Sequence, residues 1–316
     1  MTDAKGSKTN TSPLGLYPIR EVAEKTGVNP ITLRAWERRY GLVKPHRTPK
    51  GHRLYSEQDI QLIQRVVRLL ETGIPVSRVR AALEQPQTTE VPPLTGQDWE
   101  RHAEALVKAS LAFSPGALDA AYREACNLYP SVLLVRQVLR PALERLRRLE
   151  GREPQAIHGT SMLRRYLTVQ LGHHLWQQTL RNEGPTILFG CLPGDDNDLN
   201  SAFLGLLLVE RNYRLIWVPD TTPLLYLGES AEICGAAAVL LYANSTPSRR
   251  LLTQELPILA RNISVPVMVA GEASARHATD FRKAGVEPLP LDKDALLSQL
   301  RDCLVRSNQQ GTKRDE

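Results

Sequence analysis

Five short apolar runs that alternate with helical stretches limit the fold of this chain more strongly than any other feature of its sequence. Each run is four to seven residues long, and each helical stretch is 8 to 15 residues long. The runs are Thr186–Cys191, Arg214–Val218, Ala236–Tyr242, Val265–Ala270 and Val286–Leu289. Strands that alternate with helices favour an open parallel sheet with helices on both faces. The sequence therefore predicts a Rossmann-like α/β domain over residues 184–306.

The region before this domain has the periodicity of helices. Apolar residues recur every three or four positions in four segments. The segments are Asp98–Leu111, Pro115–Leu128, Ser131–Leu149 and Pro154–Leu180. We expect Pro141 to kink the third helix. Four helices of this length predict a four-helix bundle over residues 97–183.

The positive charge of the chain is concentrated in its first quarter. Residues 1–85 carry 15 Lys and Arg against 8 Asp and Glu, whereas the remainder carries 25 against 26. A basic domain on a neutral body indicates a polyanionic partner for that domain alone.

The remaining composition argues for a globular protein without a membrane partner. Hydrophobic residues make up 42% of the chain, which is enough for packed cores. The longest apolar run, Ala236–Ala243, is far shorter than the ~20 residues of a membrane-spanning helix. The first fifteen residues lack the apolar core of a secretory signal. Four widely separated cysteines indicate buried thiols, so we expect a cytoplasmic protein.

The basic region reads as an α-helical domain whose first two helices have the layout of a helix-turn-helix. The predicted helices are Ile19–Lys25, Pro30–Tyr40, Ser56–Glu71 and Val76–Leu83. Asn29 followed by Pro30 is a helix-start signal. Arg34 and Arg38 lie four apart and therefore share a face of the second helix. Arginine and asparagine side chains can hydrogen-bond base edges in a major groove.

The segment 41–55 predicts a hairpin, or wing, next to this helix pair. Its cations are Lys44, His46, Arg47, Lys50, His52 and Arg53. Pro45, Pro49 and Gly51 favour a turn that carries these cations along a phosphate backbone.

Three segments outside the predicted domains have the composition of unstructured chain. They are an arm over residues 1–15, a Pro-rich linker over residues 85–96 and a polar tail over residues 307–316. The linker starts at Gln85-Pro86 and breaks any long helix after the basic domain, which occupies residues 16–84. We therefore expect a homo-oligomer to form through the C-terminal half.

Three strings in the basic domain resemble the DNA-binding domain of the MerR family of transcription regulators. They are Tyr17–Ala23, Thr32–Leu42 and Pro45–Tyr55. The turn Gly73–Ser77 matches as well, and the Trp-Glu-Arg-Arg-Tyr-Gly variant resembles the CarH, LitR and MlrA branch. The resemblance implies a winged helix-turn-helix that binds double-stranded promoter DNA with inverted half-sites and works with RNA polymerase.

The resemblance also implies roles for single residues. The groove readers would be Asn29, Thr32, Arg34 and Arg38. The backbone anchors would be Trp36, Arg39, Tyr40, Arg47, Lys50, His52, Arg53 and Tyr55. For Trp36 and Tyr55 a core role is an equal alternative, and Tyr40 could instead pack against the wing.

Bundle and α/β domain together resemble, in element order, the cobalamin-binding module of the same branch. In light-sensing relatives a His after the first strand ligates cobalt, within a Glu-x-His-x-x-Gly motif. Here the turn at Gly194, before Asp195, is kept. Asn197, however, stands at the His position and Asn200 at the Gly position. An amide is a poor cobalt ligand because its oxygen is hard and weakly basic.

Other positions also differ from the residues that bind cobalamin in that module. Tyr242 replaces a small Ser beside the nucleotide tail, and Gly271 is the only residue kept of a Gly-Gly pair. In those relatives a Trp and a Glu-His pair cover the cofactor. They should fall near Leu146 and Ala156-Ile157 and are absent here, although His158 is one position away. We therefore expect no cofactor and no metal, with adenosylcobalamin as the alternative.

Three functions remain open at this stage. The first is a sequence-specific MerR-type regulator whose module acts through a regulatory partner protein or through oligomerisation. The second is a regulator that responds to adenosylcobalamin, light or another small molecule. The third is a constitutive architectural DNA-binding factor.

Two further interpretations concern chemistry. The Asp195–Asp198 run would favour a cation or a basic partner, or it is a solvated loop whose last residue caps a helix. The chain has no P-loop, dinucleotide fingerprint or nucleophile elbow, and we expect no enzyme activity.

Overall fold

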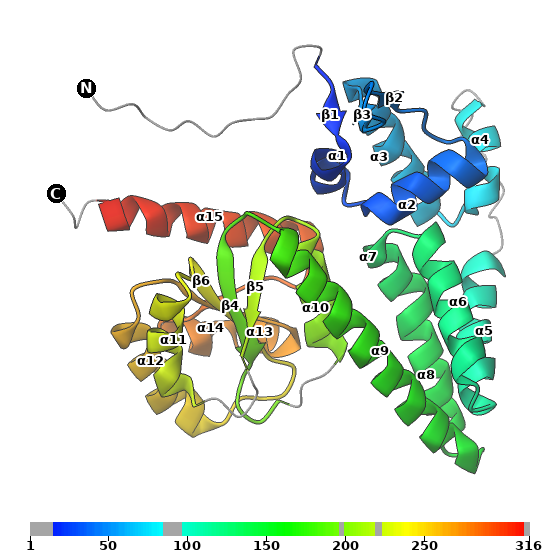
Figure 1. The fold of residues 1–316 in the computed structure, drawn as a ribbon. Helices are drawn as coiled ribbons and strands as arrows, with labels where there is room; N and C mark the ends of the chain where they lie inside the picture. Colours follow the sequence, from blue (N-terminus) through cyan, green and yellow to red (C-terminus); the bar gives the residue numbers. More distant parts are fainter. Residues whose placement is uncertain (1–14, 85–96, 196–198, 219–222, 313–316) are drawn as a thin grey trace, which may run out of the picture. The chain divides into compact units, whose positions relative to one another are not determined.

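The computed structural model describes residues 15–84, 97–195, 199–218 and 223–312 (Figure 1). It divides into two compact units, residues 1–166 and 167–316, and the division falls inside one long helix, α9 (Pro154–Arg181). The predicted arm and linker, and Asn197 of the predicted ligand site, lie outside the described residues.

The first unit begins with a small winged domain. Its elements are β1 (Tyr17–Pro18), α1 (Ile19–Thr26), α2 (Pro30–Ala35), η1 (Trp36–Tyr40), β2 (His46–Arg47), β3 (Arg53–Tyr55), α3 (Glu57–Glu71) and α4 (Val76–Glu84). β3 pairs antiparallel with both β1 and β2. The four predicted helices and the hairpin are confirmed. The sequence did not predict β1, because a two-residue strand has no periodicity to recognise.

Local signals fix the ends of these helices. Gly27 has a φ of 69° and ends α1 in the left-handed conformation, which glycine adopts without strain. Asn29 caps α2, because its side-chain oxygen accepts the Thr32 amide at 2.9 Å. Ser56 and Asp59 form a reciprocal capping box at the start of α3.

The helical bundle completes the first unit. Its elements are α5 (Gln97–Leu111), α6 (Pro115–Leu128), α7 (Ser131–Leu134), η2 (Val135–Leu139), α8 (Arg140–Leu149) and the first half of α9. The predicted third helix contains a π-helical turn, η2, and Pro141 lies in the first turn of α8 directly after it.

The second unit contains a five-stranded parallel sheet. Its strands are β4 (Thr186–Cys191), β5 (Arg214–Trp217), β6 (Ala238–Tyr242), β7 (Val267–Ala270) and β8 (Glu287–Pro288), in the order β5-β4-β6-β7-β8. Its helical elements are α10 (Leu199–Val209), η3 (Leu224–Tyr226), α11 (Leu227–Ile233), η4 (Leu251–Glu255), α12 (Leu256–Asn262), α13 (Glu272–Arg276), α14 (Ala278–Lys283) and α15 (Lys293–Thr312). This doubly wound order confirms the predicted Rossmann-like fold.

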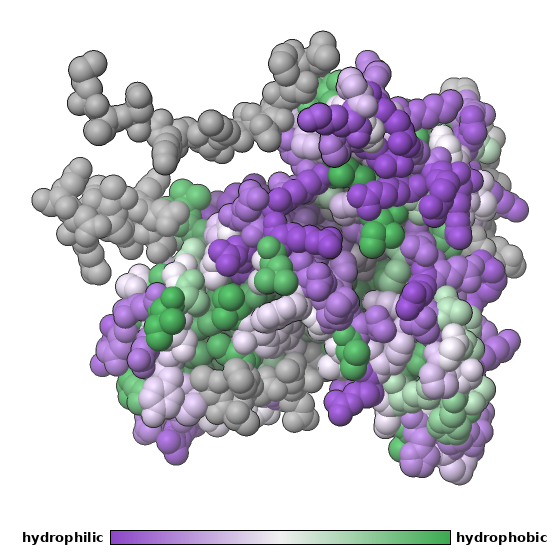
Figure 2. All heavy atoms as spheres, viewed as in Figure 1, coloured by the Kyte–Doolittle hydropathy of each residue, from purple (hydrophilic) through white to green (hydrophobic). Residues whose placement is uncertain are grey.

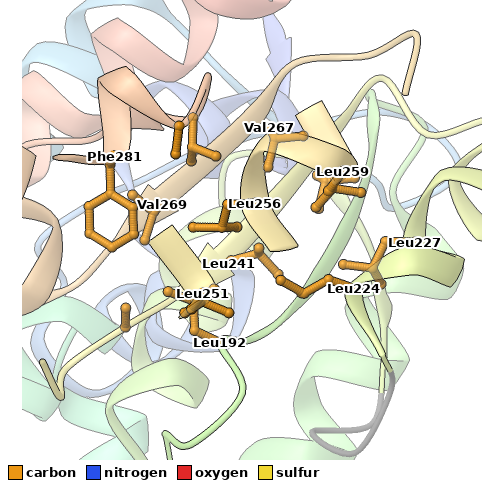
Figure 3. Close-up of a cluster of buried hydrophobic side chains, with 14 of the residues drawn as sticks. Leu192, Leu224, Leu227, Leu241, Leu251, Leu256, Leu259, Val267, Val269 and Phe281 are labelled. Atoms are coloured by element: carbon orange, nitrogen blue, oxygen red, sulfur yellow. The ribbon is translucent and has the colours of Figure 1, made fainter. Parts of the chain in front are cut away.

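One face of the sheet is covered by a leucine-rich cluster. Alternate residues of the strands, such as Val239 and Leu241, pack against leucines of η3, α11, η4 and α12 and against Phe281 of α14 (Figure 3). On the other face, Trp217 lies against Phe189, with ring centroids 4.8 Å apart. The strands are buried because helices cover both faces, and the rigid sheet holds the loops at its carboxyl edge.

Three further expectations can be compared with the structure. The polar tail is not wholly unstructured, because α15 continues through Thr312. The four cysteines are free thiols, of which Cys191 and Cys303 are buried and the other two half-buried. Within the described ranges, no helix is long and apolar enough to cross a membrane.

Candidate functional site

The helix that would enter DNA consists of α2 and η1, residues 30–40, and we call it the recognition helix. Ile31, Arg34 and Arg38 are exposed along one side of it, at the spacing of a single helix face. Arg39 is exposed beside them. The structure therefore presents two of the four predicted groove readers, Arg34 and Arg38, together to solvent.

A second side of the recognition helix is used inside the protein. Thr32 and Trp36 have 0% exposure. The indole N–H of Trp36 donates to the carbonyl of Leu128 at 3.0 Å, and the Thr32 hydroxyl lies 3.3 Å from the carbonyl of Cys126. Both carbonyls belong to the last turn of α6, where helix carbonyls lack partners within the helix. The recognition helix thus caps the C-terminus of α6.

Three residues with predicted DNA contacts are buried in the structure. In this structure Thr32 and Trp36 are fully buried against α6, so neither can touch DNA without a rearrangement. Tyr55 is also fully buried, its hydroxyl has no hydrogen-bond partner among the residues that the structure describes, and burial raises its pKa to about 12. For Trp36 and Tyr55 the structure therefore favours the core role over the backbone-anchor role. Both are large aromatic side chains that are completely buried.

Asn29 is only partly available as a groove reader. Its side-chain oxygen is occupied by the cap of α2, and the residue is half-buried. Its amide N–H groups are the part that could still meet a ligand.

The wing is a tight hairpin between β2 and β3. The Gly51 amide donates to the carbonyl of Thr48 at 2.8 Å, and the Thr48 amide donates to the carbonyl of His52 at 2.9 Å. Gly51 closes this turn with a φ of 81°, which a residue with a side chain adopts only under strain. Lys50 and His52 are therefore held exposed at the tip.

Glu37 joins the wing to the recognition helix. Its carboxylate accepts Arg47 Nη2 at 2.8 Å and Arg53 Nε at 2.5 Å. Partial burial acts to raise the pKa of Glu37, but the hydrogen bonds from Arg53 and Arg47 outweigh it and hold the pKa below its usual range. Arg47 and Arg53 were predicted as backbone anchors. In the structure they attach the wing to the recognition helix through Glu37.

The exposed cations form one basic surface on the winged domain. Its members are Arg34, Arg38, Arg39, Lys44, His46, Arg47, Lys50 and His52. Figure 2 shows that hydrophilic residues dominate the visible surface of this domain. Tyr40 is half-buried at the end of the recognition helix. This basic surface is what a phosphate backbone would meet.

The second candidate site lies at the carboxyl edge of the parallel sheet. In this strand order the chain switches direction between β4 and β6, and ligands of open α/β sheets bind outside the strand ends at that point. Here the Asp195 carboxylate, which follows β4, accepts the amides of Asn244 at 3.0 Å and Ser245 at 2.9 Å, which follow β6. One side chain therefore bridges the switch point.

The neighbouring groups at this edge are also bonded to each other. The Tyr242 hydroxyl donates to the side-chain oxygen of Asn244 at 3.0 Å, and the Glu272 amide approaches the same oxygen at 3.4 Å. Gly271 has a φ of 105°, and a Cβ there would lie 2.3 Å from the carbonyl oxygen of Ala243. The loops after β4, β6 and β7 are thus closed on one another.

The residues of this edge do not fit a cobalamin nucleotide tail. The group that spans the switch point is a carboxylate, whose negative charge repels phosphate, and each of its two oxygens accepts one backbone amide. Asn200, at the expected Gly position, is half-buried at the start of α10. Leu146 and Ala156 are buried in the bundle, while His158 is exposed on α9.

Among the residues with described positions, no three His, Cys, Asp or Glu side chains are grouped so that they could hold a metal ion.

Sequence reasoning missed three residues that hold these sites together. Glu37 was not singled out, although an acid within a run of arginines is a signal for ion pairing. Asn244 and Ser245 follow an apolar strand by two and three residues, but nothing in the sequence shows that Asp195, about fifty residues earlier, reaches them.

The fold and the basic surface define a winged helix-turn-helix domain joined to a helical bundle and a Rossmann-like domain. Residues 17–86 match the family model described as MerR HTH family regulatory protein. The HTH-type transcriptional regulator MlrA of Salmonella typhimurium is 36% identical over 133 residues, 42% of this chain. That alignment spans only about half of the relative, 53% of its length.

Two further similarities extend over more of the chain. The HTH-type transcriptional repressor CarH of Myxococcus xanthus is 23% identical over 288 residues, which is 88% of this chain and 96% of CarH. The solved structure of a cobalamin-binding protein from Desulfitobacterium hafniense covers 63% of this chain and 97% of its own, at 10% identity and a TM-score of 0.32. A similarity at that score carries no argument about the ligand.

Proposed function

We propose that this chain is a sequence-specific DNA-binding transcription regulator that acts on promoter DNA with inverted half-sites. The observation that carries the proposal is the exposed face of the recognition helix, where Arg34 and Arg38 stand beside a wing tipped by Lys50. A helix of this kind fits the major groove, and a wing of this charge follows the adjacent phosphates. RNA polymerase is the expected partner at the promoter, and the proposal assigns no catalytic role.

We propose further that the C-terminal module does not bind cobalamin and that its signal comes through a partner protein or through oligomerisation. The closed carboxyl edge, with Asp195 bonded across the switch point, supports this. The module boundaries in the proposal are residues 16–84, 97–183 and 184–306.

A gel shift with the purified full-length protein and its own upstream DNA tests the first proposal. We expect tighter binding to that DNA than to a scrambled sequence of the same length, and protection of two inverted half-sites in a footprint. Equal affinity for both DNAs would contradict sequence-specific regulation and favour an architectural factor.

A cobalamin titration tests the second proposal. The protein is mixed with adenosylcobalamin in the dark and passed over a sizing column, and the visible spectrum of the protein peak is recorded. We expect a colourless peak. A coloured peak would refute the loss of the ligand site and favour the ligand-responsive regulator instead.

A further inference from the structure

Ile31 is a large apolar side chain that the recognition helix leaves in contact with solvent. It is 54% exposed, whereas Leu33 and Trp36 of the same helix are fully buried. Single exposed apolar residues are common on protein surfaces, so exposure alone assigns no role to Ile31. Its position on the helix and its neighbours decide what it can contact.

Ile31 lies in line with the two exposed arginines of the recognition helix. Arg34 and Arg38 follow it by three and seven positions, which places the three side chains on one helix face. Ile31 is also in the first turn, two residues after the cap residue Asn29. When a recognition helix enters the major groove, its N-terminal residues contact the base edges. A groove that meets the two arginines would therefore meet Ile31 as well.

The chemistry of Ile31 limits what it can contact in a groove. Its side chain neither donates nor accepts a hydrogen bond, so a polar base edge placed against it would lose water without compensation. Thymine presents a C5-methyl group in the major groove, and apolar side chains contact that methyl group. Arginine has a different preference, because it donates two hydrogen bonds to guanine. The exposed face is thus apolar at its start and cationic further along.

We propose that Ile31 contacts the C5-methyl group of a thymine in each half-site and thereby selects a T·A base pair at that position. The proposal rests on the DNA binding proposed above, and it adds the base that the first turn of the recognition helix selects. Burial of one methyl-sized apolar group corresponds to roughly a fourfold change in affinity. We therefore expect an effect of this size for each half-site.

Uracil substitution in the DNA tests this contact, because deoxyuridine differs from thymidine only by the missing C5-methyl group. Each thymine of the duplex protected in the footprint is replaced in turn, and binding of the full-length protein is measured by fluorescence anisotropy. We expect one thymine in each half-site, at symmetric positions, whose replacement weakens binding roughly fourfold. Cytosine at the same position should also weaken binding, and 5-methylcytosine should recover part of the loss because it restores the methyl group.

Ile31→Ala and Ile157→Ala are the matched variants. They shorten isoleucines of nearly equal exposure, 54% and 52%, but Ile157 lies on α9, outside the winged domain. Ile31→Ala should bind the thymine and uracil duplexes with equal affinity, whereas Ile157→Ala should keep the wild-type difference between them. Ile31→Val keeps a branched apolar side chain and should keep part of the difference.

Three results would overturn this inference alone. If the wild type prefers its cognate DNA but no uracil replacement weakens binding, the protein contacts no thymine methyl group. If Ile31→Ala keeps the wild-type difference between thymine and uracil, another residue contacts the methyl group. If Ile31→Ala weakens binding to cognate, uracil and scrambled duplexes by the same factor and lowers the melting temperature, Ile31 packs within the protein. Equal binding of the wild type to cognate and scrambled DNA would instead refute the proposed function together with this inference.

Discussion

The winged domain and the carboxyl edge of the parallel sheet treat their polar groups in opposite ways. On the winged domain, cations such as Arg34, Arg38 and Lys50 are exposed on the outside of a tightly packed core. At the carboxyl edge, Asp195, Tyr242 and Asn244 are used to hold the loops together. The polar groups of the winged domain are therefore available to a partner, whereas those of the carboxyl edge bond to each other.

The same contrast exists within the recognition helix. Its outer side offers arginines to a partner, whereas Thr32 and Trp36 on another side cap the last turn of α6. Neighbouring residues of one helix therefore differ in function because they face different surroundings. The predictions below separate groups that are already used inside the protein from groups that are available outside it.

The largest effect is expected for Trp36→Ala. The change removes a fully buried aromatic side chain and leaves the Leu128 carbonyl without its donor, so we expect a loss of about 3–5 kcal/mol of unfolding free energy. Trp36→Phe keeps most of the packing and should lose roughly 1–2 kcal/mol. Denaturant unfolding measures both. A Trp36→Ala protein as stable as wild type would contradict the internal role of this residue.

Gly271→Ala tests how tightly the carboxyl edge is closed. The added Cβ would collide with the Ala243 carbonyl at a residue that already needs a positive φ, so we expect a loss of about 2–4 kcal/mol. Gly194 is the matched control, because it also has a positive φ but no atom of the described residues within 4 Å of the added Cβ. Gly194→Ala should therefore lose only about 1–2 kcal/mol. Equal melting temperatures for the two variants would argue against the close approach.

Arg34→Ala tests the outer side of the recognition helix. If Arg34 contacts a base, binding to the cognate site should weaken by about 1–3 kcal/mol and sequence preference should relax. Lys50→Ala, at the wing tip, should weaken binding to all DNA sequences similarly. It should also reduce the slope of log binding constant against log salt concentration by about one. Fluorescence anisotropy on cognate and scrambled DNA measures both. If Arg34→Ala weakens binding to cognate and scrambled DNA equally, Arg34 contacts a phosphate and not a base.

Asp195→Ala tests whether one carboxylate closes the switch point. The change removes the acceptor of the Asn244 and Ser245 amides, and we expect a loss of about 1–2 kcal/mol with faster hydrogen exchange at both amides. Asp292→Ala is the control, because Asp292 accepts two amides at the start of α15 instead. It should leave exchange at residues 244 and 245 unchanged; faster exchange there in both variants would point to a general loosening.

The smallest effect concerns the pH dependence of the wing. Because the pKa of Glu37 is lowered in the folded protein, its ion pairs stabilise the wing above the ordinary glutamate pKa of 4.5, and this stabilisation is lost as the pH falls through the lowered value. Glu37→Gln should be less stable than wild type by about 1 kcal/mol or less at neutral pH. The difference should vanish in acid. A difference that persists at pH 3 would exclude ionic attachment.

Much of the fold could be predicted from short-range sequence signals. Asn29-Pro30 marked the start of the recognition helix, Ser56 and Asp59 marked the start of α3, and the apolar run 186–191 gave the first strand of the sheet with its observed bounds. These signals work because capping and periodicity depend on residues within one or two turns of each other. The two-residue strand β1 and the helical continuation of α15 escaped them, because neither has a distinct local pattern.

The candidate sites were predicted less completely than the fold. The arginines of the recognition helix and the cations of the wing were identified from the sequence, and the structure exposes all of them except Arg53, which is half-buried. Thr32 was assigned to DNA, and Trp36 and Tyr55 were assigned to DNA or to the core; all three are buried. The side that a helical residue faces depends on what packs against the helix, and α6 lies more than ninety residues further along the chain.

The sequence by itself determined the order and type of the elements, the MerR-type strings and the concentration of positive charge in the first quarter, since these are properties of neighbouring residues. Only the tertiary structure decided which groups are available to a partner. Asp195 was visible as an acid after a strand, but its closure of the switch point depends on amides brought to it by another strand of the sheet. Contacts between distant segments form only when the sheet and helices pack, because packing sets the direction of each side chain.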